Sequence, residues 1–453
     1  MSRFEPILLR NRSVEDARAL AVYRARGGYR AAEKAIATMS PDAVIAEVKR
    51  SNLRGRGGAG FPVGLKWSFL PPHRDVTYLC VNFDESEPGT FNNRVLVETD
   101  PHQLLEGILI AAFAIRATVS YVYIRGEYPE AFHTLQRALD EAYAAGLFGR
   151  RIFGTPFSTE CYIHRGAGAY ICGEETGLIE SIEGKRGWPR IKPPFPAVRG
   201  LFGKPTIVNN VESLCCLPHI IERGADWFRA IGTPGSAGPK LYTVSGPVNR
   251  PGCYEAPLGL PVRELIFGEE FARGMLGNRK VKGVIPGGLS VGILTADELD
   301  CRLDFEDPQR YGLLGLGTAG AIVIGDDADM RAVLVNVARF FSSESCGQCT
   351  QCREETTWIY KIARRIAAGA GRMEDLDLIE ELTTSMGMMP GLSICGLSDG
   401  AAYAVGTIVR KFRREFEQHI AAQEPGRAEA VLRQVNRSVY EWPLHAGTMA
   451  AAR

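Results

Sequence analysis

Apolar and polar residues follow patterns along the chain that predict helices and strands in alternation. Ser40 followed by Pro41 is typical of a helix start, with a side-chain cap and a first-turn proline. The alternation indicates a layered α/β domain with a largely parallel sheet. Apolar residues at helical spacing predict helices over residues 13–39, 41–52, about 100–117 and 129–145. Continuous apolar runs predict strands over residues 76–82 and 119–125.

The pattern changes after a Gly/Pro/Ser run at residues 232–239, which is typical of a linker. Short strands and turns then continue to about residue 324 and predict a compact α+β module. Helical patterns return over residues 330–343, 353–368, 374–386 and 399–421. The predicted domains are residues 1–235, 236–328 and 329–422, followed by a polar tail at 423–453.

Composition narrows the class of protein. The chain has 453 residues, of which 45% are hydrophobic and 23% charged, so it can bury an ample globular core. A formal net charge of +1 gives no reason to expect a nucleic-acid partner. The longest uncharged apolar run, residues 107–115, is too short to span a bilayer, and residues 1–6 do not resemble a signal peptide. We therefore expect a soluble, intracellular protein.

The densest glycine segment is residues 55–61, Gly-Arg-Gly-Gly-Ala-Gly-Phe. Its letters also match the dinucleotide fingerprint G-x-G-x-x-G, but that fingerprint needs a strand before it and a helix after it. Here a helical pattern precedes the loop, and the next strand pattern comes later. A Rossmann loop and a purely structural loop remain as alternative interpretations of this segment. The aromatic residues downstream favour a loop against which a ligand lies.

Three further segments carry groups suited to a large polar ligand. Asp84, Glu85 and Glu87 directly follow a predicted strand, the place where ligands bind in open α/β sheets. Residues 166–176 combine small residues with Tyr170 and the adjacent acids Glu174 and Glu175. Adjacent acids point in different directions, so we expect them to reach different partners; a helix start with acids in its first turn is the alternative. The third segment pairs a stiff proline-rich stretch, 192–196, with two amides at 209 and 210.

Eleven cysteines, an odd number in a long chain, argue against a disulfide framework. Most are scattered and are expected to be small buried side chains. Cys346, Cys349 and Cys352 instead form C-x2-C-x2-C, a spacing typical of one [4Fe–4S] cluster, and Cys395 is the best candidate for the fourth ligand. Zinc, which also takes four thiolates, and no metal remain as alternatives. A flavin is the cofactor that would connect hydride chemistry to such a one-electron carrier.

In these motifs the chain resembles the NADH-binding flavoprotein subunits of respiratory complex I, which in bacteria are the F subunits. The resemblance covers about residues 15–420. It rests on six motifs in the same order, at residues 55–67, 84–90, 168–176, 192–196, 208–212 and 346–352.

The resemblance implies a fold and an activity. The fold is a Rossmann-like FMN and NADH domain, a β-grasp module of the SLBB type and a C-terminal helical bundle that carries the [4Fe–4S] cluster. The implied activity is NADH dehydrogenation, in which hydride passes from nicotinamide to FMN and electrons then pass singly through the cluster to partner subunits. Those partners would be a small [2Fe–2S] subunit and a large multi-cluster subunit. The quinone-reducing complex would lie on the cytoplasmic face of the cell membrane, and this chain would not insert into the bilayer.

Roles carry over residue by residue from the same resemblance. The catalytic residue would be Glu87, near the flavin, where its carboxylate disfavours extra negative charge on the reduced ring. The residues implied in holding FMN are Gly55, Arg56, Gly57, Gly58, Ala59, Gly60, Gly64, Lys66, Asn82, Asp84, Tyr170, Gly173, Glu174, Val208, Asn209 and Asn210. Those implied in holding NADH are Phe61, Phe69, Glu175, Lys192 and Phe195, besides Glu87. The implied cluster ligands are Cys346, Cys349, Cys352 and Cys395.

The chain departs from the family pattern at few positions. Phe83 stands where members usually have Ala, so its side chain must point away from the flavin or reshape the pocket. Gly396 and Ser398 also differ from the commonest residues after the last ligand cysteine.

Two rival functions stay open at this point. One is the diaphorase subunit of an NAD-linked hydrogenase or formate dehydrogenase. The extra ferredoxin-like or thioredoxin-like domains often found in those subunits are not recognisable in this sequence. The other is a non-catalytic scaffold that keeps the cluster for structure.

Overall fold

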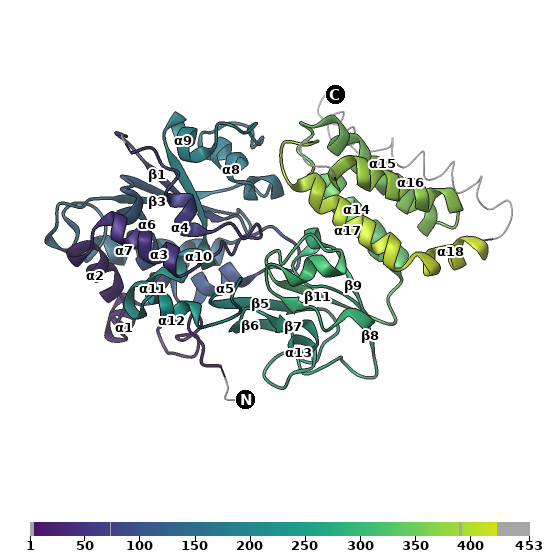
Figure 1. Cartoon of the computed structure of the whole chain (residues 1–453), viewed down its shortest axis with the longest axis horizontal. Coiled ribbons are helices and arrows are strands. Elements are labelled where there is room, and N and C mark those ends of the chain that lie inside the picture. Colours follow the sequence, from purple (N-terminus) through teal and green to yellow (C-terminus); the bar gives the residue numbers. More distant parts are fainter. Residues whose placement is uncertain (1–3, 73, 389–391, 424–453) are drawn as a thin grey trace, which may run out of the picture. The chain divides into compact units, whose positions relative to one another are not determined.

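The computed structural model describes residues 4–72, 74–388 and 392–423 (Figure 1). The chain forms two compact units, residues 1–325 and 326–453. The predicted boundary at residues 235 and 236 lies inside the first unit, so the finer division of that unit stays a prediction. Most of the predicted tail, from residue 424 on, lies outside the described residues.

The first unit contains a four-stranded sheet whose neighbouring strands all run parallel, in the order β3-β2-β1-β4. This confirms the predicted parallel sheet. The sequence predicted β1 and β2, but β3 and β4 were not recognised as strands. The strands are β1 (Tyr78–Phe83), β2 (Val119–Ile124), β3 (Glu160–Arg165) and β4 (Thr206–Asn210).

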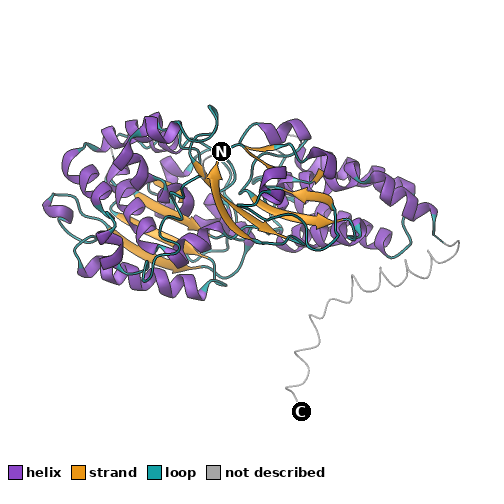
Figure 2. Ribbon diagram, turned by 90° about the horizontal axis from the view of Figure 1, so that it is seen from below, coloured by secondary structure: helices purple, strands orange, loops and turns teal. Residues whose placement is uncertain are grey.

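Helices cover both faces of this sheet (Figure 2). On one face, Leu79 and Val81 of β1 join the buried residues of α6 in the core. On the opposite face, the Tyr123 hydroxyl of β2 lies 2.9 Å from Ser181 Oγ of α8. The helices of this region are α1 (Leu20–Ala25), α2 (Arg30–Thr38), α3 (Pro41–Arg50), α4 (Val63–Trp67), α5 (Asn92–Thr99), α6 (Pro101–Ile115), α7 (Pro129–Ala144), α8 (Glu175–Ile182), α9 (Pro196–Arg199), α10 (Val211–Cys215), α11 (Leu217–Arg223) and α12 (Ala225–Arg229).

The predicted long helix over residues 13–39 is wrong, because the structure has two short helices, α1 and α2, in its place. Gly27, with φ +88°, separates them. Gly28 packs on Tyr23, and a Cβ at this position would lie 2.1 Å from a carbon of that ring. The turn therefore needs both glycines, and the helical pattern on either side concealed it. By contrast, α3 begins as predicted, with Ser40 Oγ accepting a hydrogen bond from Ala43 N at 3.1 Å.

A second, five-stranded sheet with the order β6-β5-β11-β8-β9 follows in the first unit, together with a two-stranded sheet of β10 and β7. Strand β11 runs parallel to β5 and antiparallel to β8. The Gly/Pro/Ser run that precedes this sheet forms a tight turn, in which Thr233 N donates to Ser236 O at 3.0 Å. The elements are β5 (Pro239–Ser245), β6 (Gly252–Pro257), β7 (Leu260–Pro261), α13 (Val262–Phe267), β8 (Val281–Ile285), β9 (Leu294–Thr295), β10 (Arg302–Leu303) and β11 (Gly320–Gly325).

A buried ion pair joins the two sheet regions. Lys240 Nζ of β5 lies 2.5 Å from Glu212 Oε2 of α10, and both side chains are 0% exposed. Glu212 also accepts hydrogen bonds from Leu241 N and from the Asn92 side chain. Burial lowers the pKa of Lys240, and Glu212 opposes that shift. A charged pair so far from water is stable only because each charge has a partner.

The second unit is helical, as predicted. Its helices are α14 (Met330–Glu344), α15 (Thr350–Ala367), α16 (Met373–Thr383), α17 (Leu397–Lys411) and α18 (Arg413–Ala421). The single helix predicted over residues 399–421 is instead two helices that meet at Phe412. Within the part of the chain that the structure describes, no helix combines the length and the apolar character that crossing a bilayer requires.

Replacing one partner of the buried ion pair should destabilise the first unit. The Glu212→Gln variant leaves Lys240 without a counter-charge, and we expect a loss of about 3–5 kcal/mol in unfolding free energy. Urea unfolding at neutral pH measures this. The double variant Glu212→Leu/Lys240→Met should recover much of the loss because it removes both charges. Asp300→Asn, which breaks the exposed Arg263–Asp300 pair, is the matched control and should leave the midpoint unchanged. A Glu212→Gln midpoint equal to that of the wild type would contradict the prediction.

Candidate functional site at the carboxyl ends of the parallel strands

The strand order creates a topological switch point between β1 and β4. From β1 the chain adds β2 and β3 on one side, and β4 then pairs with the other side of β1. Ligands of open α/β sheets bind beyond the carboxyl ends of strands at such a point. Asn82 and Asn210 are register partners at these ends. Two of the predicted site residues, far apart in sequence, are therefore brought together by strand pairing.

The glycine loop is an ordered, closed loop at this edge of the sheet. Gly55 N donates to Phe61 O at 2.9 Å, which closes the segment on itself. A Cβ on Gly57 would lie 3.1 Å from Asn210 Cβ, so the loop backbone lies close against the end of β4. Gly60 has φ +65°, and a Cβ there would lie 2.6 Å from the Phe305 ring. Helix α3 precedes the loop and α4 follows it, so this loop is not the strand–loop–helix fingerprint of a Rossmann fold.

Arg56, although part of this loop, directs its side chain into the protein interior. Its Nη2 donates to Ala237 O at 2.7 Å, and its backbone N donates to Ser213 Oγ at 2.9 Å. Its Nε and Nη1 have no hydrogen-bond partner among the described residues. Gly64 serves helix packing, since a Cβ there would lie 2.7 Å from Lys49 N.

The end of β1 is tied to the turn at Tyr170–Gly173. Asn82 Nδ2 donates to Gly173 O at 2.7 Å, and Asn82 Oδ1 accepts from Asp84 N at 3.1 Å. Ser86 Oγ donates to Asp84 Oδ2 at 3.2 Å. These bonds fix the acidic loop and the small-residue turn relative to one another.

The two glutamates of the acidic loop have different environments. Glu85 is buried and accepts hydrogen bonds from Asn93 N, Arg94 N and the Tyr128 hydroxyl. Burial raises the pKa of Glu85 to about 7, although these bonds oppose the rise. Glu85 therefore holds the start of α5, a role that the sequence did not suggest.

Glu87 faces the Tyr170 turn and the second sheet. It accepts from the Tyr170 hydroxyl at 2.6 Å, from Ser290 N at 2.7 Å and from Ser290 Oγ at 2.8 Å. Burial raises the pKa of Glu87, and the three hydrogen bonds oppose this rise. The structure thus places Glu87 and Tyr170, both predicted site residues, in direct contact. Ser290 is an additional partner that sequence reasoning missed.

Two lysines and two glutamates form a cluster beside the glycine loop. Lys192 Nζ lies 2.8 Å from Glu174 and 3.1 Å from Glu175. Lys66 Nζ lies 3.2 Å from Glu175 and donates to Val208 O at 3.1 Å. Burial opposes ionisation of Glu175, but the two lysines lower its pKa below the ordinary value. The cluster therefore keeps Glu175 charged near neutral pH.

The adjacent acids share one partner and differ in the other. Glu174 is the N-cap of α8, and its Oε2 accepts from Thr176 N at 2.8 Å and from Gly177 N at 2.9 Å. Glu175 is the first residue of that helix. The expectation of different partners therefore holds only in part, because both acids contact Lys192. The alternative interpretation, a helix start with acids in its first turn, describes the local structure correctly.

Half-exposed aromatic rings lie in the same segments. Phe61 and Phe69 have ring centroids 5.9 Å apart and are 42% and 52% exposed. Phe195, three residues after Lys192, is 57% exposed. Large apolar rings left open to solvent beside charged groups are typical of a ligand site.

The remaining predicted residues of this edge have structural contacts of their own. Asn209 Oδ1 accepts from Trp67 Nε1 at 2.9 Å, and Asn210 Oδ1 accepts from Glu212 N at 2.9 Å as the N-cap of α10. Phe83 points into the core, where its ring packs against Tyr128 with centroids 5.9 Å apart. The large side chain at this position therefore points away from the edge of the sheet.

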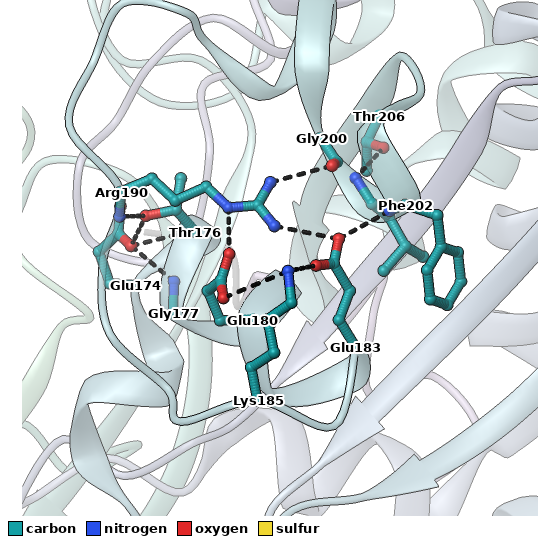
Figure 3. Close-up of polar contacts among 11 residues, drawn as sticks. Glu174, Thr176, Gly177, Glu180, Glu183, Lys185, Arg190, Gly200, Phe202 and Thr206 are labelled. Atoms are coloured by element: carbon teal, nitrogen blue, oxygen red, sulfur yellow. Dashed lines mark hydrogen bonds and ion pairs between the residues drawn. The ribbon is translucent and has the colours of Figure 1, made fainter.

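Sequence reasoning also missed Arg190, which joins α8 to the segment that follows it (Figure 3). Its guanidinium bonds Glu180, Glu183 and Gly200 O. A signal was present, because Arg190 lies two residues before Lys192 in a proline-rich stretch. Its partners, however, could not be read from spacing.

In the second unit, the cysteine loop lies against the segment that carries Cys395. Cys349 is the N-cap of α15, and Cys352 lies in its first turn. Ile394 N donates to Cys349 Sγ at 3.3 Å, and Ser345 Oγ lies 3.4 Å from Cys352 Sγ. Donors aimed at thiolate sulfurs are a usual feature of iron–sulfur sites. The seven scattered cysteines are buried, as expected.

The residues present fit the two predicted groups. For FMN, a glycine backbone lies close to Asn210, and amides, lysines and acids gather at the switch point. For the cluster, the segment that carries Cys395 lies against the cysteine loop, and polar contacts reach the Cys349 and Cys352 sulfurs, as is usual at iron–sulfur sites. Among the described residues, no three His, Cys, Asp or Glu side chains are spaced to hold a metal ion, so the set of four thiol ligands stays a prediction.

Family models match three regions of the chain. Residues 48–219 match the Nuo51 FMN-binding domain, and residues 332–419 match the NADH-ubiquinone oxidoreductase-F iron-sulfur binding region. Residues 241–283 match the SLBB domain. The first match spans the glycine loop and the switch point, and the second spans all four cysteines of the predicted cluster.

Similar proteins are found among curated sequences and solved structures. The second F subunit of the NADH-quinone oxidoreductases of Rhizobium meliloti (strain 1021) is 51% identical over 92% of this chain and 98% of its own length. The mitochondrial NADH dehydrogenase [ubiquinone] flavoprotein 1 of Dictyostelium discoideum is 47% identical over 85% of this chain and 81% of its own length. A chain of an air-oxidised NAD+-reducing [NiFe]-hydrogenase crystal structure is 37% identical, with a TM-score of 0.78 over 95% of this chain and 71% of that one.

Proposed function

The chain belongs to the family of NADH-quinone oxidoreductase F subunits, and we propose that it oxidises NADH at a bound FMN and passes electrons singly through one [4Fe–4S] cluster. The observation that carries this proposal is the gathering of the glycine loop, the acidic loop and the Glu174–Glu175 turn at the carboxyl ends of β1 and β4. When bound, FMN accepts hydride from NADH, and the cluster takes electrons one at a time.

The residues of the switch point would hold FMN. The backbone at Gly57, which lies close against Asn210, has no side chain and would let a phosphate-bearing ligand approach the loop closely. Lys66 supplies a cation at this edge, and Asn82, Asn209 and Asn210 are oriented by hydrogen bonds. Because these partners fix the side chains in advance, FMN binding costs little additional ordering.

The exposed rings and the charged cluster would hold NADH. Phe61, Phe69 and Phe195 offer faces on which the dinucleotide's rings can stack. Glu175 and Lys192 would make polar contacts with the dinucleotide. Glu87 would add a carboxyl group beside the Tyr170 hydroxyl, in a place where burial raises its pKa. The chain's task is to align two rings, because hydride transfer needs no general base.

Cys346, Cys349, Cys352 and Cys395 would ligate the cluster. Electrons would then leave to partner subunits, a small [2Fe–2S] subunit and a large multi-cluster subunit. With them the chain would sit peripherally on the inner face of the cell membrane. A member of this family works within a larger enzyme, so partners of some kind are required.

A second candidate function is the diaphorase subunit of an NAD-linked hydrogenase. The likeness to chains of NAD+-reducing [NiFe]-hydrogenase structures, at 36% and 37% identity, favours it. Higher identities, 45% and 51%, to the F subunits of NADH-quinone oxidoreductases favour the quinone-reducing enzyme. Elemental analysis of the complex purified from its native cells separates the two, since a [NiFe]-hydrogenase contains nickel.

The purified protein should be yellow and should bleach with NADH in the absence of oxygen. The reason is that bound FMN absorbs strongly at about 450 nm only when it is oxidised. Anaerobic titration with NADH, followed by absorbance, measures the change. A colourless protein after reconstitution with FMN, or a spectrum that NADH leaves unchanged, would overturn the proposal and favour a scaffold role.

The Glu175→Gln variant should weaken NADH binding more than FMN binding. Loss of a charged hydrogen-bonding group costs about 1.5–3 kcal/mol, or roughly 10- to 100-fold in the NADH dissociation constant. FMN affinity should change by less than about threefold. Spectral titrations with each ligand measure both constants, and Glu98→Gln, which loses an ion pair with Arg94, is the control. Equal losses for NADH and FMN would count against this role for Glu175.

The Cys395→Ala variant should lose the cluster and keep FMN. The thiol of Cys395 is the predicted fourth ligand, and a cluster with three thiolates is lost or altered readily. Electron paramagnetic resonance of the reduced protein and iron analysis measure the cluster, while absorbance measures FMN. Cys301→Ala, which removes a buried cysteine of the first unit, is the matched control. An unchanged cluster signal in Cys395→Ala would show that the fourth ligand is another residue.

A further inference from the structure

The segment between α8 and β4, residues 183–205, carries two predicted NADH contacts, Lys192 and Phe195. It contains only the four-residue helix α9 and a single turn at Leu201–Gly203, so it has little regular backbone hydrogen bonding to fix it. Side chains must therefore hold it in place. The question is which side chain sets the position of Lys192 and Phe195.

Arg190 makes the main attachment of this segment (Figure 3). Its Nε bonds Glu180 Oε1, and its Nη2 donates to Glu183 Oε1 at 3.0 Å. Its Nη1 donates to Gly200 O at 2.9 Å. One guanidinium thus binds α8 on one side and the end of α9 on the other. A planar group with donors in several directions is required for this, and the point charge of a lysine cannot replace it.

The backbone of Arg190 makes a second attachment, to the start of α8. Arg190 N donates to Thr176 Oγ1 at 2.8 Å, and the hydroxyl of Thr176 in turn bonds Glu174 Oε2. The other oxygen of Glu174 accepts from Lys192 Nζ at 2.8 Å. A continuous chain of hydrogen bonds therefore connects Arg190 to the ammonium group of Lys192.

The acids that hold Arg190 also hold a second point of the segment. Glu183 Oε1 accepts from Phe202 N at 2.7 Å, so the same carboxylate fixes residues on both sides of α9. Burial opposes ionisation of Glu183, but hydrogen bonds from Lys185 and Arg190 lower its pKa. Glu183 therefore stays charged near neutral pH and keeps its hold on the guanidinium.

Lys185 offers a built-in comparison. It contacts the same two acids as Arg190, at 3.8 Å to Glu180 and 2.6 Å to Glu183. Its side chain is 59% exposed, whereas that of Arg190 is 26% exposed. Lys185 reaches neither Gly200 nor Thr176 in any hydrogen bond of the described residues. It shares the charge of Arg190 without the attachment to the segment.

We propose that Arg190 is a positioning residue for the dinucleotide, because it holds residues 190–200 on α8 and so sets where Lys192 and Phe195 meet NADH. This inference rests on the proposed function. Arg190 acts through the segment and touches no reacting atom. Its loss leaves the FMN-binding edge of β1 and β4 intact.

Two variants and a matched control test this role. Arg190→Lys keeps the charge but loses the fork, and Arg190→Gln loses both. Lys185→Gln removes the other cation on the same acids. In Arg190→Gln we expect the NADH dissociation constant and KM to rise about 10-fold or more, with kcat and FMN content within about twofold of the wild type. Arg190→Lys should also raise the NADH dissociation constant and KM, and Lys185→Gln should match the wild type.

Hydrogen exchange supplies a readout independent of activity. Peptides covering residues 184–204 should exchange faster in both Arg190 variants, without added NADH, while peptides from β1 and β4 stay unchanged. Unchanged exchange in residues 184–204, together with wild-type NADH affinity, would overturn the inference. Loss of FMN or protection throughout the first unit would also overturn it, because Arg190 would then serve general stability.

A double-mutant cycle identifies the route by which Arg190 acts. If Arg190 works by placing Lys192, the Arg190→Gln/Lys192→Gln double variant should bind NADH little worse than Lys192→Gln alone. Fully additive losses would show that Arg190 does not act through Lys192, contrary to the inference.

A wild-type protein that NADH does not bleach would refute the proposed function itself. Normal bleaching with unaffected Arg190 variants would refute the inference alone.

Discussion

The ion pair between Glu212 and Lys240 is the constraint on which the first unit depends. Glu212 belongs to α10, which begins directly after β4, and Lys240 belongs to the first strand of the second sheet. The pair therefore fixes the second sheet to the end of the strand that carries Asn209 and Asn210. Ser213, the next residue of α10, holds the backbone of Arg56 in the glycine loop. One buried contact thus sets the distance between the glycine loop, the switch point and the second sheet.

Around this fixed point, the site is assembled from loops that each have their own support. Asn209 is held by Trp67, Asn82 by Gly173, and Glu87 by Tyr170 and Ser290. The side chains predicted to meet the cofactors are therefore oriented by neighbouring residues, of which Gly173 and Tyr170 are themselves predicted to meet FMN and Trp67 and Ser290 are not. Such preorganisation suits a reaction in which two rings must be aligned and no proton has to be removed by a base.

The functional motifs could be recognised from the sequence because glycine runs, adjacent acids and cysteine spacing are local signals. The parallel sheet followed from two apolar strands, but β3 is a polar edge strand and β4 ends in two asparagines, so neither has a clear strand pattern. The helical pattern around Gly27 and Gly28 concealed the turn that these glycines form. The register that pairs Asn82 with Asn210, and the burial of Lys240, depend on contacts between distant segments. No spacing rule reveals such contacts.

The glycine loop has a consequence for how this protein can change over evolutionary time. A side chain on Gly57 would meet Asn210 and one on Gly60 would meet Phe305, while Gly58 forms a bridge with Gly317. Gly57, Gly58 and Gly60 thus each contact a different and distant part of the chain. A mutation at one of them is tolerated only with a compensating change at its own partner. Such paired substitutions arise rarely, so the loop is expected to diverge more slowly than the surface around it.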